Sequence, residues 1–95
     1  MDLDERKLRI LSAVVENFIA TGDPVGSKLV AQLLGNQVSS ATVRNDMSAL
    51  FDMGLVEQPH TSAGRVPSHL GYRVYVDRLM HPKPVPKRER DEIDA

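Results

Sequence analysis

The sequence predicts a winged helix-turn-helix fold, mainly α-helical with one small β-hairpin. Three observations lead to this fold class. A short helix, a tight turn and a longer helix follow one another between residues 27 and 53, in the order of a helix-turn-helix unit. Two short extended segments around a loop follow directly at residues 55–67, as a wing does. One helix before this unit and one after it complete a single domain over residues 1–80, without an internal repeat.

The first helix is expected within residues 4–20. Asp2 and Glu5 have the spacing of a capping box at its start, and Gly22 is expected to end it. Its large apolar residues recur at helical spacing on one face, which we expect to pack on the core. They are Leu8, Leu11, Val15, Phe18 and Ile19.

A turn at residues 23–26 leads to a short second helix over residues 28–34. Ser27 is expected to cap the start of this helix, and Gly35 is expected to end it. Its apolar residues are Leu29, Ala31 and Leu33.

The third helix is expected from Ala41 to about Met53, with Ser39 or Ser40 as its cap and Val38 as a hydrophobic staple. One stripe of this helix is apolar, and the opposite stripe is small and polar. The apolar stripe consists of Val43, Met47 and Leu50. The polar stripe consists of Ala41, Asn45, Ser48 and Asp52. Gly54 is expected to close the helix.

Two short strands are expected at residues 55–58 and 65–67, joined by a polar loop. Ser68 can then cap a last helix with one apolar face. That face consists of Tyr72, Tyr75, Val76 and Leu79. We expect its two tyrosines to belong to the core rather than to a platform for stacking bases.

Composition excludes several classes of protein but does not by itself indicate DNA. The 95 residues include 12 Lys and Arg against 13 Asp and Glu, for a formal net charge of −1. A strongly basic chain would have indicated a nucleic-acid partner, so here any site for a polyanion must come from local placement of charge. No cysteine is present for a disulfide or thiolate metal site. No apolar run is long enough to span a membrane, and no signal peptide is recognised, so we expect a cytoplasmic protein.

The segment 81–95 differs in composition from the rest of the chain. Prolines at 82, 84 and 86 favour extended chain, and only Val85 and Ile93 are sizeable apolar residues. We interpret this segment as a linker toward a further domain. A frayed natural C-terminus fits the composition nearly as well.

The polar face of the third helix is the main indication of function. Small residues and hydroxyl groups in its first turn suit close approach to phosphate oxygens. Arg44 and Asn45 have side chains that can bind guanine and adenine edges in the major groove. The candidate DNA contacts on this helix are Ser39, Ser40, Thr42, Arg44, Asn45 and Ser48. The alternative is that Ser39 and Ser40 only cap the helix and Arg44 pairs with a carboxylate. Asp46 lies nearer the apolar stripe, so we assign it a structural pairing.

The loop of the hairpin gives a second, independent indication. No carboxylate occurs from Gln58 through Tyr75, so Arg65 and Arg73 add positive charge beside the third helix. A wing of this kind contacts the DNA backbone or the minor groove. The candidate contacts are His60, Thr61, Ser62, Gly64 and Arg65. The alternative is a polar, solvated hairpin tip without a partner.

The sequence does not favour an enzyme, a metal site or a cofactor. His60 and Ser62 lack a third residue placed to orient the imidazole. The three histidines are nine and twelve residues apart and match no metal-binding spacing. Gly22 and Gly26 do not form a phosphate loop. The remaining rival is a winged helix that binds protein, because the fold alone does not prove function.

Four segments in this order resemble the amino-terminal region of the heat-inducible transcription repressor HrcA family. They are residues 24–28 (PVGSK), 38–47 (VSSATVRNDM), 57–67 (EQPHTSAGRVP) and 71–77 (GYRVYVD). The resemblance extends from about Leu8 to Met80. Its recognition-helix motif falls on Ser39 to Met47 and its wing motif on Pro59 to Pro67. Asn36-Gln37 and Phe51-Asp52 depart from the family pattern, and Phe51 is expected beside the Arg44 flank.

The resemblance implies a bacterial repressor that binds double-stranded DNA at an inverted repeat, the CIRCE operator, upstream of chaperone operons. It implies a homodimer in the full-length protein, formed by a larger region with a GAF-like part beyond residues 81–95. It also implies the chaperonin as a further partner that helps to hold the DNA-binding form. An inverted repeat requires two copies of the domain, so we expect this chain alone to be monomeric or a weak dimer.

Overall fold

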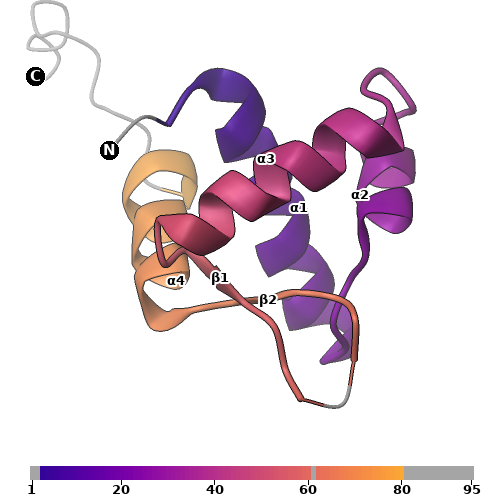
Figure 1. Ribbon diagram of the computed structural model, residues 1–95. Helices are drawn as coiled ribbons and strands as arrows, with labels where there is room; N and C mark the ends of the chain where they lie inside the picture. Colours follow the sequence, from indigo (N-terminus) through magenta and orange to yellow (C-terminus); the bar gives the residue numbers. More distant parts are fainter. Residues whose placement is uncertain (1–2, 61, 81–95) are drawn as a thin grey trace, which may run out of the picture.

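A computed structural model describes residues 3–60 and 62–80 of the chain (Figure 1). Its helices and its antiparallel strand pair follow the predicted order and confirm the winged helix-turn-helix class. The elements are α1 (Glu5–Thr21), α2 (Ser27–Leu33), α3 (Ser40–Asp52), β1 (Val56–Glu57), β2 (Val66–Pro67), α4 (His69–Tyr75) and the π-helical turn η1 (Val76–Met80). No helix in these ranges is long and apolar enough to cross a membrane.

Helix α1 begins two residues later than the predicted capping box. Its cap is Asp4, whose carboxylate accepts a hydrogen bond of 2.8 Å from the backbone N–H of Lys7. The predicted capping box was wrong because Asp4, and not Asp2, precedes the first helical residue, Glu5. Asp2 lies outside the described residues. Gly22 ends the helix as predicted, in the left-handed conformation with φ of 74°.

The buried face of α1 is wider and ends earlier than the sequence pattern indicated. It consists of Ile10, Leu11, Ala13, Val14 and Val15. Ile19, predicted on the apolar face, is 63% exposed. The reason is that α1 contacts α2, α3, α4 and β2, so more than one side of its middle turns, residues 10–15, is covered.

The cap predicted for α2 was also wrong. Its N-cap is Gly26, without a side-chain hydrogen bond, and Ser27 is already the first helical residue. Val30 and Ala31 are buried, whereas Leu29 and Leu33 remain largely exposed. A helix of two turns presents only a narrow edge to the core, so most of its apolar residues stay outside. The turn that follows includes Gly35 and Asn36 with positive φ angles of 73° and 61°.

Helix α3 agrees closely with the prediction. Ser39 caps it, Val43, Met47 and Leu50 are buried, and the opposite stripe is exposed. Asp46 is buried and accepts hydrogen bonds from Nε and Nη2 of Arg6, at 2.5 and 3.1 Å. Nζ of Lys7 lies 3.8 Å from the same carboxylate. The structural pairing expected for Asp46 is therefore confirmed, and it joins the start of α1 to the middle of α3.

The hairpin is shorter than predicted. β1 and β2 pair antiparallel with Val56 opposite Pro67 and Glu57 opposite Val66. Leu55 is buried in the core instead of extending β1, and its N–H bonds to the carbonyl of Leu50. The predicted second strand loses Arg65 because this residue forms an isolated bridge with Val25.

Helix α4 is fixed to the body at its start and along its inner side. Ser68 caps it as predicted, accepting from the N–H of Gly71 and donating to the carbonyl of Gly54. A side chain at Gly71 would lie 2.0 Å from the carbonyl oxygen of Leu55, so only glycine allows this contact. Tyr75 is buried and Tyr72 packs against the core, which confirms their structural role. The side chain of Leu79 lies outside the described part.

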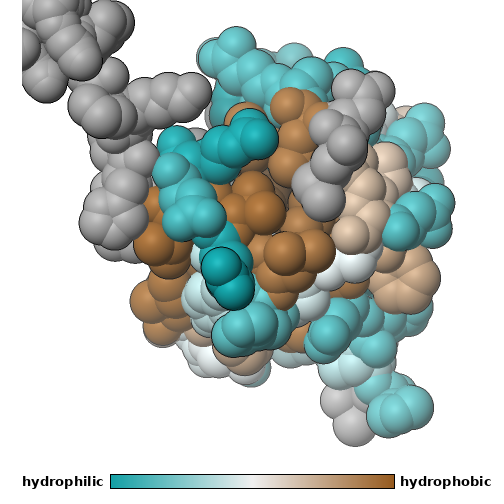
Figure 2. Space-filling view, turned by 90° about the vertical axis from the view of Figure 1, so that its left-hand side faces the viewer, coloured by the Kyte–Doolittle hydropathy of each residue, from teal (hydrophilic) through white to brown (hydrophobic). Residues whose placement is uncertain are grey.

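The core lies where α1, α3, β1 and α4 meet. Its largest fully buried side chains are Ile10, Leu11, Val14, Val15, Val25, Val30, Val43, Leu50, Leu55 and Val56. Figure 2 shows the face on the side of α4, where hydrophobic residues gather in the centre and hydrophilic residues surround them. The wing loop and the exposed side of α3 are best seen in Figure 1.

Candidate nucleic-acid interface

The exposed stripe of α3 carries polar side chains that the rest of the domain does not use. Ala41, Arg44, Asn45 and Ser48 are exposed and recur at helical spacing. Arg44 and Asn45 have no side-chain hydrogen bond or ion pair to any residue that the structure describes. The alternative reading, in which Arg44 pairs with a carboxylate, therefore finds no support among these residues. Both side chains can reach outward from a rigid helix.

The first turn of α3 has a different role. The hydroxyl of Ser39 accepts the backbone N–H of Thr42 at 3.2 Å and donates to the Thr42 hydroxyl at 3.1 Å. The capping role that the sequence left open is thus confirmed for Ser39 and not for Ser40, which is the first helical residue. Ser40 and Thr42 are half-buried. Of the predicted residues on α3, Arg44, Asn45 and Ser48 are the most accessible.

The wing loop is held by bonds within itself. The hydroxyl of Ser62 accepts the N–H of Gly64 at 2.9 Å, and the N–H of Ser62 reaches the carbonyl of Pro59 at 3.4 Å. Gly64 is buried, and a Cβ there would lie 3.0 Å from both Cβ of Pro24 and N of Val25. His60 is exposed at the tip, and Thr61, predicted as a contact, lies outside the described residues.

Arg65 is the most constrained side chain of the predicted set. Its backbone exchanges two hydrogen bonds with Val25, at 2.8 and 3.0 Å. Its Nη1 donates to the carbonyls of Ala63 at 2.9 Å and Gly64 at 3.4 Å. Its guanidinium carbon lies 5.6 Å from the centre of the Phe51 ring, on the last turn of α3. The wing is therefore attached both to the turn before α2 and to α3.

The structure brings Arg44 and Arg65 together. Both line a small hollow of about 150 Å³ between α3, the base of the wing and the turn before α2. The other residues that line it are Val25, Gly26, Ser27, Met47 and Ala63. Among the residues that the structure describes, no carboxylate lines this hollow. Arg73, expected in the same cluster, instead lines a separate hollow on α4 with Asp77.

The sequence did not reveal two features of this site, although it placed Phe51 beside the Arg44 flank. The turn at residues 25–27 forms one wall of the hollow, and Phe51 contacts Arg65. The turn gave no signal of this role, because its position depends on the bridge between Val25 and Arg65. The sequence did contain an indication for Phe51, since it is a large aromatic residue on a polar part of the third helix.

The middle of α3 is fixed by charge. The hydrogen bond from Arg6 to Asp46, together with their attraction, raises the pKa of the Arg6 guanidinium. The pair holds α3 against α1. A pair of this kind fixes orientation more reliably than it adds net stability.

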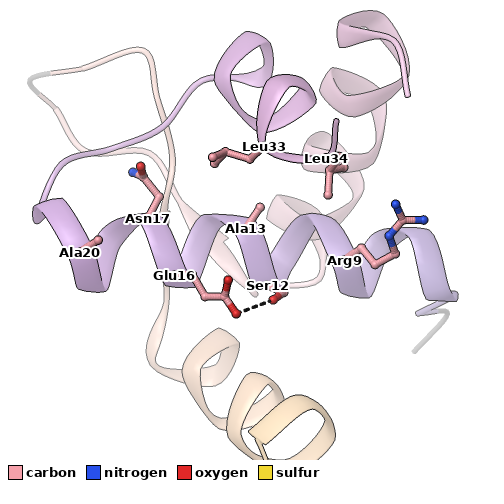
Figure 3. A pocket seen from close by; sticks show the side chains of 8 residues that line it. All are labelled: Arg9, Ser12, Ala13, Glu16, Asn17, Ala20, Leu33 and Leu34. Carbon is pink, nitrogen blue, oxygen red and sulfur yellow. Dashed lines mark hydrogen bonds between the residues drawn. The ribbon is translucent and has the colours of Figure 1, made fainter. Parts of the chain in front are cut away.

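A larger hollow, about 430 Å³, lies between α1 and α2 (Figure 3). None of the predicted contact residues within the described ranges lines it. Its carboxylate, Glu16, accepts hydrogen bonds from Ser12 at 3.1 Å and from the Tyr75 hydroxyl at 3.0 Å. Burial, and then this bond to Glu16, raises the pKa of Tyr75. Within residues 3–60 and 62–80, no three histidine, aspartate or glutamate side chains gather as a metal site would require.

Comparison with known proteins agrees with this geometry. Residues 2–78 match the profile of a family described as "Winged helix-turn-helix transcription repressor, HrcA DNA-binding". The chain belongs to the HrcA winged-helix family. This confirms the resemblance found in the sequence motifs. The residues predicted on α3 and on the wing all lie within the matched region.

Named relatives of the HrcA family share about half of their residues with this chain. A heat-inducible transcription repressor HrcA from Thermobifida fusca is 54% identical over 93 residues, covering 98% of the chain and 27% of the relative. HrcA from Acidothermus cellulolyticus is 56% identical, over 97% of the chain and 27% of the relative. HrcA from Clostridium perfringens is 58% identical, over 82% and 23%. The chain thus spans about a quarter of the length of these curated relatives.

One solved structure also matches well. The crystal structure of a hypothetical protein superimposes with a TM-score of 0.78 at 39% sequence identity, covering 83% of this chain and 24% of that one. The HrcA family is described as one of DNA-binding transcription repressors, which is not a class of enzyme. The prediction that this chain is not an enzyme agrees with that description.

Proposed function

We propose that this chain is the DNA-binding domain of a transcription repressor and binds double-stranded DNA through α3 and the wing. The observation that carries the proposal is that Arg44 of α3 and Arg65 of the wing line one hollow, to which the described part of the chain contributes no carboxylate. Positive charge is thus concentrated locally in a chain whose formal net charge is −1. Membership of the HrcA family supports the same function.

The two elements have different parts in this binding. Arg44 and Asn45 enter the major groove and bind base edges, for which guanidinium and amide groups are suited. Ser40, Thr42 and Ser48 approach the phosphates beside them, and the Ser39 cap sets the start of the helix. Arg65, with the wing residues, contacts the DNA backbone or the minor groove and contributes affinity more than sequence preference. The wing residues are His60, Thr61, Ser62 and Gly64.

The operator that we propose rests on the resemblance to the HrcA family. We propose that it is the CIRCE inverted repeat of chaperone operons and that the full-length repressor binds it as a homodimer in the bacterial cytoplasm. Residues 81–95 then link the domain of residues 1–80 to a dimerisation region. The chaperonin is proposed as a partner that supports the DNA-binding form. Two copies of a domain with little net charge would depend on base contacts and on pairing for their affinity.

A gel-shift titration tests this function. The chain is titrated against a duplex carrying the CIRCE inverted repeat and against a scrambled duplex of equal length and composition. We expect a preference for the inverted repeat that is weak for the isolated chain, because each copy binds half of the site. Equal binding to both duplexes, or none, would contradict the proposal and favour a winged helix that binds protein. Tight, two-fold binding would instead place dimer contacts within residues 1–80.

A further inference from the structure

Phe51 is a large aromatic residue that the core does not use. It is 47% exposed on the last turn of α3. It lies two helical turns after Arg44, and therefore on the same side of the helix. Its ring faces the guanidinium of Arg65 at 5.6 Å. Such a ring attracts a cation through its negative face.

The other contacts of the Arg65 side chain leave part of its guanidinium for the Phe51 ring to hold. Nη1 is held by two carbonyls of its own loop, at 2.9 and 3.4 Å. Nε is buried and has no partner among the described residues. The loop thus holds one end of the guanidinium, and Phe51 contacts it from a different element. Because α3 is bound to α1 through Asp46, the Phe51 ring is held in place and can hold the Arg65 side chain against α3.

We propose that Phe51 is a positioning residue for Arg65. It holds the guanidinium in the hollow that Arg65 shares with Arg44, so that the wing arginine is already oriented when a DNA phosphate arrives. This inference rests on the proposed function of the site. An arginine that must be ordered during binding weakens association by about 3- to 10-fold relative to one that is ordered beforehand.

The test compares Phe51→Leu, which removes the ring but keeps an apolar side chain, with Phe51→Tyr, which keeps the ring. The matched control is Leu70→Ala, because Leu70 is similarly exposed, at 43%, on α4. We expect Phe51→Leu to weaken binding to both the inverted-repeat and the scrambled duplex by about 3- to 10-fold. Phe51→Tyr and Leu70→Ala should bind as the wild type does.

The same variants are then made in an Arg65→Ala background. If Phe51 acts through Arg65, Phe51→Leu has no further effect there, because the two residues are coupled. If Phe51→Leu weakens binding equally in both backgrounds, the ring contacts DNA or supports the fold by itself. That outcome would overturn the proposal.

A measurement without DNA separates this inference from the proposed function. The NMR signal of the Arg65 Nε–H is expected to be shifted by the ring in the wild type and in Phe51→Tyr. In Phe51→Leu it should move to the position of a free arginine. An unchanged signal overturns the positioning role, even if the wild type binds the operator. A wild type that prefers neither duplex overturns the proposed function, and with it the purpose assigned to Arg65.

Discussion

The exposed side of α3 and the base of the wing are neighbours, but they differ in how far their side chains are held by other residues. On α3 the backbone is fixed, while Arg44 and Asn45 have no partner among the described residues. At the base of the wing the side chain of Arg65 is itself held, by the carbonyls of Ala63 and Gly64 and by the Phe51 ring, while its backbone bonds to Val25. A free side chain on a rigid helix can adjust to a base edge, whereas a fixed guanidinium offers charge at a set position.

This difference explains how a chain without excess positive charge can serve a polyanion. A basic arm attracts DNA by number of charges. Here, Arg44 projects from a helix fixed to α1, Arg65 is held by its own loop and by Phe51, and the buried Asp46 of α3 is paired with Arg6 and Lys7. The position of a few arginines therefore takes the place of a large number of positive charges.

The largest expected effect is on the free side chain. Arg44→Ala should weaken binding to the inverted repeat by about 1–3 kcal/mol while leaving binding to scrambled DNA nearly unchanged, because one bidentate base contact is lost. The control is Arg73→Ala, which removes an equal charge from α4. Gel-shift titration of both variants on both duplexes checks this. Equal losses for the two variants would show that Arg44 acts only as a positive charge.

A backbone change tests the fixed region. Gly64→Ala places a Cβ 3.0 Å from Pro24 and Val25 and should reduce the free energy of unfolding by about 1–2 kcal/mol. Gly26→Ala meets no atom within 4 Å and should cost only about 0.5 kcal/mol, the difference between glycine and alanine at the N-cap of α2. Urea denaturation compares them. If Gly64→Ala is as stable as Gly26→Ala, the wing is not held by this contact.

The same two regions show what the sequence could and could not predict. The stripes of α3 followed from spacing alone, because a long helix on a core must bury one side. The cap at Ser39 followed from residue type. The contact between Arg65 and Phe51 could not be predicted from the sequence, because it depends on how the wing pairs with the turn before α2. Spacing also could not reveal that Leu29 and Leu33 would stay exposed, since this depends on how narrow an edge α2 presents.

Arg65→Ala should have a smaller and less selective effect than Arg44→Ala. If Arg65 contacts a phosphate, the variant loses affinity for both duplexes to a similar degree, and the slope of log affinity against log salt falls by about one. Titrations at several salt concentrations measure this slope. An unchanged slope would mean that the fixed guanidinium serves the wing itself and does not contact the phosphate backbone.

The smallest expected effect concerns the caps that begin α1 and α3. The pKa of Asp4 lies below its ordinary value of 3.8, chiefly because its carboxylate accepts the backbone N–H of Lys7, with attraction to Lys7 and Arg6 in addition. Its stabilising effect is therefore complete above pH 3.8 and is lost as the pH falls through the lowered pKa. The Ser39 cap of α3 has no charge to lose in this range.

Asp4→Asn keeps an acceptor for the cap but does not titrate, so it should lose less thermal stability than the wild type between about pH 6 and about pH 3. Ser39→Ala should reduce the free energy of unfolding by about 1 kcal/mol at either pH. Melting curves of the three proteins at both pH values separate the two caps. If Asp4→Asn proved as sensitive to acid as the wild type, the acid response would have to arise elsewhere than in the cap of α1.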